Sequence, residues 1–248
     1  SVIASGGTIP YNYLWNTGDT TSSLQNISAG QYIVSVIDSN GCILYDTLNV
    51  SQPNAILVND SINDVSCYGY SDGDISLSIT GGTGSYALLW ANGDSLFYRN
   101  QLSSAWYNIS IIDSNNCLYV DSFMVMQPAQ LTNISALISP TCFGYSNGSI
   151  NNLSSGGVSS YSYLWNTGDT TQNLQNIIAG QYSVIITDFN NCIMYDTLLL
   201  EQPLLLSYSQ TNDSVSCFGN NDGSIDLSIN GGIVPYSFLW STGDSSED

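Results

Sequence analysis

The chain has 248 residues, with 20 acidic side chains and a single basic one, Arg99, and because it contains no His its formal net charge is −19 at pH 7. Nucleic-acid binding and docking to anionic lipid are excluded, because both need clusters of Lys and Arg. Catalysis by His or Lys, a His-ligated metal and a Walker-type phosphate loop lack their essential residues. Yet 43% of the residues are hydrophobic, with 17 Tyr and 5 Trp, so the chain can bury a core and is not a disordered acidic tail. No apolar run is long enough for membrane insertion.

An uninterrupted 75-residue repeat organises the chain. Four tryptophans, paired glycines, Gln-Pro dipeptides and two series of cysteines all recur at this spacing. Such an internal repeat indicates an array of similar structural units, which we call modules. Taking each Gln-Pro as a module end, we expect partial Ig-like modules over 1–53 and 204–248 and complete ones over 54–128 and 129–203. The chain is then expected to be a segment of a longer array.

Within a module the hydrophobic residues alternate with a period of two, which predicts β-strands. Short β-branched and aromatic runs are bounded by Gly, Asn, Asp and Ser at intervals of about 8–12 residues, the spacing of a β-sandwich. For the second module the pattern predicts strands near 56–62, 74–80, 86–91, 96–101, 106–113 and 118–126. The expected fold is all-β, with tandem Ig-like β-sandwich modules in a 75-residue repeat.

Aromatic residues at fixed module positions are expected to form the core. The repeated tryptophan falls on the third predicted strand, where Ig-like sandwiches bury a Trp. A tyrosine at the turn into a later strand matches the tyrosine corner, whose hydroxyl reaches back to a backbone group. The alternative role for these side chains is a platform on which sugars stack. The expected core residues are Trp15, Trp90, Trp165, Trp240, Tyr32, Tyr107 and Tyr182.

Six cysteines, two per module, indicate disulfides in an oxidising compartment, because the chain has neither His nor a Cys-x-x-Cys motif for a metal. We expect them to pair within modules, which closes loops of 50 residues. The expected pairs are Cys67–Cys117 and Cys142–Cys192, with Cys42 and Cys217 pairing outside the residues given. Two other pairings also preserve the repeat: Cys67–Cys192 between adjacent modules, and Cys42–Cys67 across the Gln-Pro junction.

Calcium is the one cofactor that the residues suggest. Hard cations prefer oxygen ligands, and divalent cations would relieve the repulsion among 20 acids. The candidate ligands lie at two Asp-Gly turns and are Asp72, Asp74, Asp222 and Asp226. The alternative is a turn that favours Asp and Gly for its own geometry, and the third module supports it, since Asn147-Gly148-Ser149 supplies no carboxylate.

Several motifs together resemble an SprB-type repeat, named for the large cell-surface gliding adhesin of Bacteroidota. They are Gly156-Gly157, Tyr161-Ser162-Tyr163-Leu164-Trp165-Asn166-Thr167-Gly168, Ala179-Gly180-Gln181-Tyr182, Asp188-Phe189-Asn190-Asn191-Cys192 and Cys217-Phe218-Gly219-Asn220-Asn221-Asp222-Gly223. The resemblance covers the whole chain and departs from the pattern only in detail, as where Ser104-Ala105-Trp106-Tyr107 replaces Ala-Gly-x-Tyr. It implies cell-surface display by type IX secretion, in long arrays that act as adhesin or filament, and it supplies no catalytic residues.

Acidic residues precede hydroxyl residues unusually often. Of 17 Asp with a following residue, 11 precede Ser or Thr, against about 4 for a random order. In seven of these pairs the next residue is Ile, Leu, Val or Thr, which resembles the O-glycosylation sequon of secreted Bacteroidota proteins; the alternative is that such pairs suit turns. The candidate sites are Thr20, Thr47, Ser61, Ser95, Thr170, Thr197 and Ser214.

The expected function is an extracellular structural or adhesive repeat array that forms a cell-surface fibre or filament, and not an enzyme. The alternative is a carbohydrate- or surface-binding module of a secreted adhesin. A hydrolase would need a carboxylate pair, which nothing in the sequence singles out. The expected partners are neighbouring modules of the same chain, other copies in a filament and surface glycans, with no nucleic acid and no membrane insertion.

Overall fold

The computed structural model describes residues 1–247, and within them every regular element is a β-strand. The chain divides into two compact units. The first comprises residues 1–61, 76–97 and 108–122; the second comprises residues 62–75, 98–107 and everything from Phe123 onward. The described residues include no helix of the length and apolarity that a membrane crossing requires. The expected all-β class is confirmed.

The strands recur at the spacing of the sequence repeat. The first three are β1 (Asn12–Trp15), β2 (Gly30–Ile37) and β3 (Ile43–Val50). The next six are β4 (Leu57–Asn63), β5 (Gly73–Thr80), β6 (Ala87–Trp90), β7 (Tyr98–Leu102), β8 (Ala105–Ile112) and β9 (Leu118–Val125). They are followed by β10 (Thr132–Ile138), β11 (Gly148–Ser155), β12 (Ser162–Trp165), β13 (Leu174–Ile177), β14 (Gly180–Thr187) and β15 (Ile193–Leu200). The last two are β16 (Ser207–Asp213) and β17 (Ser224–Asn230).

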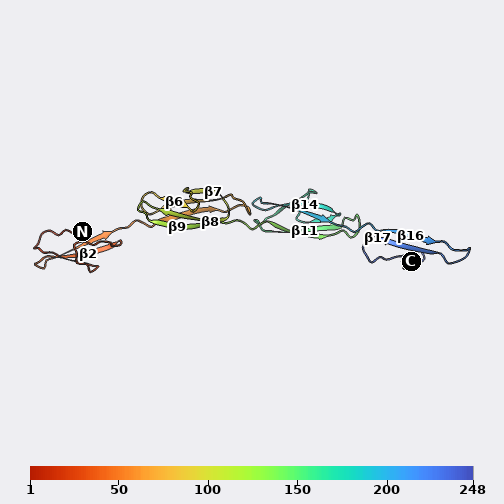
Figure 1. Ribbon diagram of the computed structural model, residues 1–248, viewed down its shortest axis with the longest axis horizontal. Coiled ribbons are helices and arrows are strands. Elements are labelled where there is room, and N and C mark those ends of the chain that lie inside the picture. The colour runs from red at the N-terminus through yellow and green to blue at the C-terminus, as the bar shows by residue number, and fades with distance from the viewer. Residues whose placement is uncertain (248) are drawn as a thin grey trace. The chain divides into compact units, whose positions relative to one another are not determined.

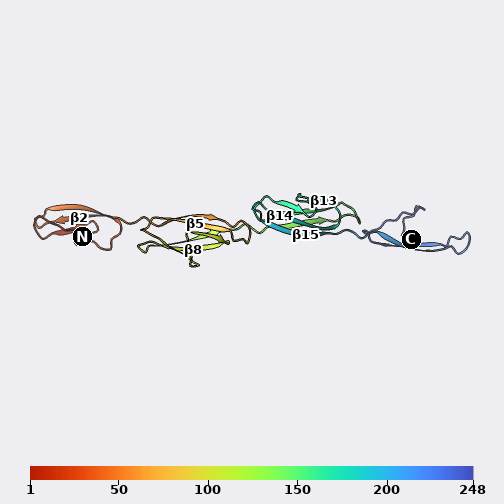
Figure 2. The ribbon, with the colours of Figure 1, turned by 90° about the horizontal axis from the view of Figure 1, so that it is seen from above.

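Each set of six strands forms the same two sheets, β4-β5-β7 with β6-β8-β9 and then β10-β11-β13 with β12-β14-β15. The first, second and fourth strands therefore make one sheet, and the third, fifth and sixth make the other. This is the arrangement of strands A, B, E and C, F, G in an Ig-like sandwich. In the later set β11 and β14 belong to different layers (Figure 1), while β14 and β15 lie side by side (Figure 2) as an antiparallel pair. The expected Ig-like sandwich is confirmed.

Alternation along the strands builds the core over residues 132–200. On β14, Tyr182, Val184 and Ile186 are buried, while the residues between them are only half-buried. Val184 pairs with Trp165 of β12, whose indole is 2% exposed. The indole Nε1 donates to Thr171 O at 2.9 Å, so burying the ring leaves no donor unpaired. The cluster also contains Ile150, Tyr163, Leu174 and Leu200.

The other repeated tryptophans show what this position requires. Trp15 and Trp90 are buried, and their indoles donate to Thr21 O at 2.7 Å and to Leu96 O at 2.9 Å. Trp240 is only half-buried and lies outside any strand. The reason is the pairing of β12 with β14: among the described residues no equivalent of β14 follows Trp240.

A tyrosine corner occurs in three places. The hydroxyls of Tyr32, Tyr107 and Tyr182 each donate to the carbonyl four residues earlier, at 2.8, 2.9 and 2.9 Å. Tyr32 and Tyr182 are buried, and Tyr107 is half-buried. These side chains fix the turn before β2, β8 and β14, so they are structural residues and not exposed sugar platforms.

Candidate functional site: a disulfide junction between modules

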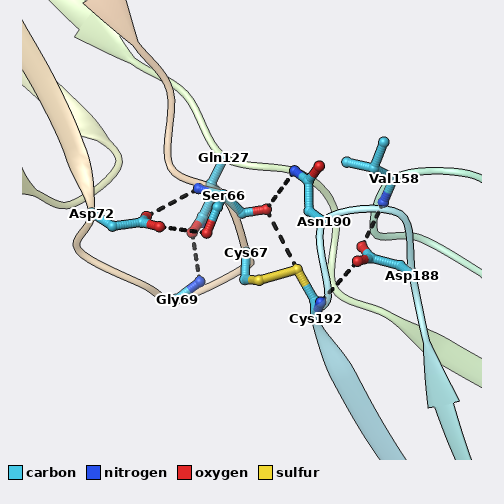
Figure 3. Close-up of a disulfide and its surroundings, with 9 residues drawn as sticks. All are labelled: Ser66, Cys67, Gly69, Asp72, Gln127, Val158, Asp188, Asn190 and Cys192. Carbon is cyan, nitrogen blue, oxygen red and sulfur yellow. Dashed lines mark hydrogen bonds between the residues drawn. A yellow bond between two sulfur atoms is a disulfide. The ribbon is translucent and has the colours of Figure 1, made fainter.

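One disulfide joins residues of consecutive modules. Cys67 follows β4 and Cys192 precedes β15; they are 125 residues apart in sequence, with a Cα–Cα distance of 5.6 Å. Both belong to the second compact unit, and they are 4% and 8% exposed. Figure 3 shows the sulfur–sulfur bond between two turns. We call these two turns and the side chains that hold them the junction.

The expected pairing within modules is wrong, and the inter-module alternative is the one present. In the third module the Cys142 turn lies beside Gln202, whose Oε1 accepts a hydrogen bond from Gly144 N at 2.8 Å. Cys192 lies beyond the other end of β15, a strand of 8 residues, which spans about 26 Å. Because a disulfide needs Cα atoms within about 7 Å, Cys142 and Cys192 cannot meet without dismantling the sandwich.

The first turn of the junction is held in place by Asp72 and Gln127. Ser66 donates both its backbone N–H and its hydroxyl to the Asp72 carboxylate, with a distance of 3.0 Å from N to Oδ1. Gly69, at a φ of 78°, donates its N–H to Gln127 Oε1 at 2.8 Å. Because Gln127 belongs to the Gln-Pro dipeptide at the module end, the turn that presents Cys67 is tied to the point where the chain enters the next module.

Asp188 builds the second turn. Its carboxylate is buried, and Oδ1 accepts the N–H of Cys192 at 2.9 Å while Oδ2 accepts the N–H of Val158 at 2.8 Å. A buried carboxylate bonded in this way is satisfied. Gly157, at a φ of 57°, lies so close that an added Cβ would overlap Asp188 Oδ2. The turn that presents Cys192 is therefore fixed by a side chain and by a glycine packed against it.

Asn190 spans the two turns directly. Its Nδ2 donates to Ser66 O at 2.9 Å, and the Cys192 sulfur lies 3.4 Å from the same oxygen (Figure 3). In the two preceding modules the equivalent side chains, Asn40 and Asn115, donate instead to Thr8 and Thr83 of their own modules. Val158 stands where those modules have threonine, so Asn190 has no local hydroxyl and binds the neighbouring turn.

The four other cysteines occupy the same two turns. Asp38 and Asp113 accept the N–H of Cys42 and Cys117 at 2.8 and 2.9 Å, as Asp188 does for Cys192. Thr141 N donates to Asn147 Oδ1 at 3.0 Å, and Ser216 N donates to Asp222 Oδ1 at 3.1 Å, as in the Cys67 turn. Cys42, Cys117, Cys142 and Cys217 are exposed free thiols. For each of them, a partner placed as in the junction, 125 residues away, would fall outside residues 1–248.

Desolvation and the Asp113 carboxylate raise the pKa of the Cys117 thiol. Because the thiolate is the reactive form, a raised pKa slows thiol–disulfide exchange. The turn that presents this cysteine therefore also keeps it protonated.

The calcium candidates have other partners in the structure. Asp72 and Asp222 accept hydrogen bonds from Ser66 and Ser216, each within its own turn. Both carboxylate oxygens of Asp74 accept a hydrogen bond from Asn63 Nδ2, at 3.1 Å. Asp226 lies on β17 and is exposed. Over residues 1–247, no group of three or more His, Cys, Asp or Glu is placed to hold a metal ion. Asn147, which closes the equivalent turn without a charge, matches the turn interpretation.

All seven candidate glycosylation residues are exposed. In three of the pairs the aspartate accepts the N–H of the hydroxyl residue that follows it, at 2.8 Å for Thr47, 2.7 Å for Ser95 and 2.8 Å for Thr197. The Asp-Ser and Asp-Thr pairs therefore have a local backbone role while the residue that carries the hydroxyl stays at the surface.

Replacing Gly157 by alanine is expected to destabilise the protein by about 1–3 kcal/mol more than replacing Gly168. Both residues have a positive φ, of 57° and 90°, and both substitutions strain the backbone. Only the Gly157 Cβ would overlap the Asp188 carboxylate, whereas Gly168 has no atom within 4 Å, and overpacking adds about 1–3 kcal/mol. Chemical denaturation of the two variants measures the difference, and equal losses would contradict the role of Asp188.

Stability is expected to fall in acid. Hydrogen bonds from Ser66 lower the pKa of Asp72, those from Ser216 lower the pKa of Asp222, and the N–H groups of Thr8 and Cys42 lower the pKa of Asp38. With a lowered pKa in the folded state, the unfolded chain binds more protons, so this stabilisation is complete above the ordinary pKa of about 3.9 and is lost below it. The thermal midpoint, followed by circular dichroism, should drop as the pH falls below about 4.

The chain supplies its own control for this acid effect. Asn147 closes the turn that Asp72 closes one module earlier, so Asp72→Asn should keep the turn and remove its proton linkage. The variant should lose less stability between pH 5 and pH 2 than the unmodified chain does. An identical acid profile would show that the Asp72 turn does not contribute.

Sequence reasoning missed the residues that position the disulfide, namely Asp188, Asn190 and Gly157. A signal was present, because Asp38, Asp113 and Asp188 each lie four residues before a cysteine. Read as an Asp-capped turn, this pattern would have placed Cys42, Cys117 and Cys192 at the start of a strand and at one end of the sandwich.

A comparison with protein families agrees with this repeat architecture. The family model described as the SprB repeat matches residues 59–95, 138–170 and 208–245, which confirms the resemblance in the sequence. Among solved structures, one similar chain is the crystal structure of Down Syndrome Cell Adhesion Molecule isoform 1.30.30, N-terminal eight Ig domains, with a TM-score of 0.24 and 10% identity. The alignment covers 78% of this chain and 37% of the other chain. No curated protein sequence matches significantly.

Proposed function

The chain carries SprB-type repeats, and on that premise we propose that it is part of an extracellular structural or adhesive array that forms a cell-surface fibre or filament. The junction carries the proposal, because its disulfide joins one module to the next instead of closing a module on itself. It adds a second covalent link beside the Gln-Pro connection. Separate binding domains on flexible linkers would gain nothing from such a link, whereas a continuous strand would.

The same disulfide supports an extracellular location, because the cytosol keeps thiols reduced. Export by the type IX pathway is the route that the resemblance implies. A net charge of −19 favours solubility of a surface-displayed chain and disfavours lateral association. Adhesion would then depend on partners other than acidic surfaces, such as surface glycans.

A structural role also fits the contacts that the acidic residues make. SprB repeats and Ig-like sandwiches are structural or adhesive in kind. Asp72 and Asp222 close turns, and Asp188 is buried under Cys192. The proposal therefore assigns no catalytic residue to the chain.

Electron microscopy of material sheared from the native host tests the proposed fibre. We expect long, regular filaments that are labelled along their length by antibodies against this chain. Isolated particles without axial repetition, labelled by the same antibodies, would contradict the fibre.

We also propose that the exposed Asp-Ser and Asp-Thr sites carry O-linked glycans, which would shield a surface poor in charge. The intact mass of native material decides the matter. Hexose-sized increments that map to Thr20, Thr47, Thr170 or Thr197 would support glycosylation, and a mass equal to the bare sequence would exclude it.

One observation favours a second candidate function, the binding of carbohydrate or another surface. Tyr45 on β3 and Tyr195 on β15 occupy equivalent positions and are 69% and 72% exposed. Exposed aromatic rings are the usual stacking surface for sugars. The test is glycan binding by two variants. Binding that is lost in Tyr45→Ala/Tyr195→Ala but kept in Tyr182→Phe, which alters a buried tyrosine corner, would establish this function.

A further inference from the structure

We infer that the junction has a further function, which is to carry tension past the folded modules along a short covalent path. This inference rests on the proposed fibre, since only a tethered array is pulled. Tension applied to the two ends of the chain reaches Cys67 from one side and Cys192 from the other. Because the two sulfurs are bonded, the covalent path crosses directly between them, and residues 68–191 lie off it.

The bypassed residues include the larger part of the folded structure. They contain every strand from β5 to β14 and the buried tryptophans Trp90 and Trp165. Hydrogen bonds and packing alone hold such sheets and cores together. An applied force can therefore separate the sheets strand by strand. With the path closed at Cys67–Cys192, the force does not act on the ends of this segment.

Between Cys192 and Cys217 the path that remains has little slack, whereas the antiparallel sheet β1-β2-β3 still lies on the path before Cys67. After Cys192 it runs through β15, with 8 residues, then past Gln202-Pro203 and through β16, with 7 residues, to Cys217. Strands already rise about 3.3 Å per residue, against a limit of about 3.6 Å for a fully extended chain. Under tension, β15 and β16 can therefore lengthen by only about a tenth before the force acts on covalent bonds.

The same route recurs in the sequence. Cys217 lies in a turn closed by Ser216 and Asp222, as Cys67 lies in the turn closed by Ser66 and Asp72. Cys117 and Cys142 bracket β9 and β10, as Cys192 and Cys217 bracket β15 and β16. In an array with the same pairing, alternate segments between such cysteines would be linked in series, which gives two parallel covalent paths with the rest of each module attached to their sides.

Single-molecule stretching of the 248-residue chain from tags at its two termini tests this inference. In the oxidised chain the fully unfolded contour length should be shorter than in the dithiol-reduced chain by 125 residues, which is about 410–450 Å. The Cys67→Ser/Cys192→Ser variant should show the long contour with or without reductant. The Cys117→Ser/Cys142→Ser variant, which keeps the junction, should show the short one until it is reduced.

Equal contour lengths before and after reduction would overturn the inference. So would a shortening of about 330–360 Å, since two loops of 50 residues within modules would account for it. The stretching measurement does not depend on fibre formation. A chain that shows the 125-residue shortening, but whose native material shows no filaments, would refute the proposed fibre and leave the covalent path through the disulfide unaffected. Filaments built from chains that show no such shortening would support the fibre and refute the covalent path through the disulfide.

Discussion

Replacing Cys67 and Cys192 together by serine should lower the free energy of unfolding by about 2–5 kcal/mol. The disulfide closes a loop of 125 residues, so its removal frees the unfolded chain more than the loss of a short loop would, by about 0.6 kcal/mol for each doubling of loop length. Denaturant titration should show the two modules beginning to unfold separately, because a link between neighbouring repeats couples their stability.

The matched control is Cys117→Ser/Cys142→Ser, which removes two exposed thiols and leaves the junction intact. Its free energy of unfolding should stay within about 0.5 kcal/mol of the unmodified chain. If this variant loses as much stability as the first, those cysteines are bonded in solution, and the pairing described above is wrong.

Trp165→Ala should cost about 3–5 kcal/mol. The ring is 2% exposed, lies in the cluster with Val184 and Leu200, and leaves behind a cavity that the two sheets cannot close. The substitution also removes the donor that satisfies Thr171 O. Thermal or denaturant unfolding of the variant measures the loss.

Leu164 is the neighbouring control, because it points to the opposite face of β12 and is 49% exposed. Leu164→Ala should change stability by about 0.5 kcal/mol at most. Similar losses at both positions would mean that the alternation of this strand has been misassigned.

Sequence patterning predicted the strands closely, since a period of two leaves little choice of which face is buried. In the second module all six predicted strands lie within two residues of β4 to β9. The indole and tyrosine-corner positions followed from the same pattern. Trp240 shows the limit of this reasoning, because a strand forms only where its partner strand is present.

Cysteine pairing could not be read from the sequence, because all three candidate pairings keep the 75-residue register. The choice depends on which ends of the sandwich Cys67 and Cys192 occupy, and so on strand lengths and on the hairpin between β14 and β15. The residues that orient the turns, Asp188 and Asn190, act on backbone groups of Val158 and Ser66 that are distant in sequence. Only the spacing of four residues between Asp188 and Cys192 is a local signature, and it says nothing of the contacts with Val158 and Ser66.

Peptide mapping of the unreduced protein tests the central claim most directly. Pepsin suits the experiment, because the chain has a single basic residue for trypsin and because acid suppresses thiol–disulfide exchange. We predict a linked pair of peptides that contain Cys67 and Cys192. Peptides that join Cys67 to Cys117 and Cys142 to Cys192 would show that each module closes on itself and would contradict the junction.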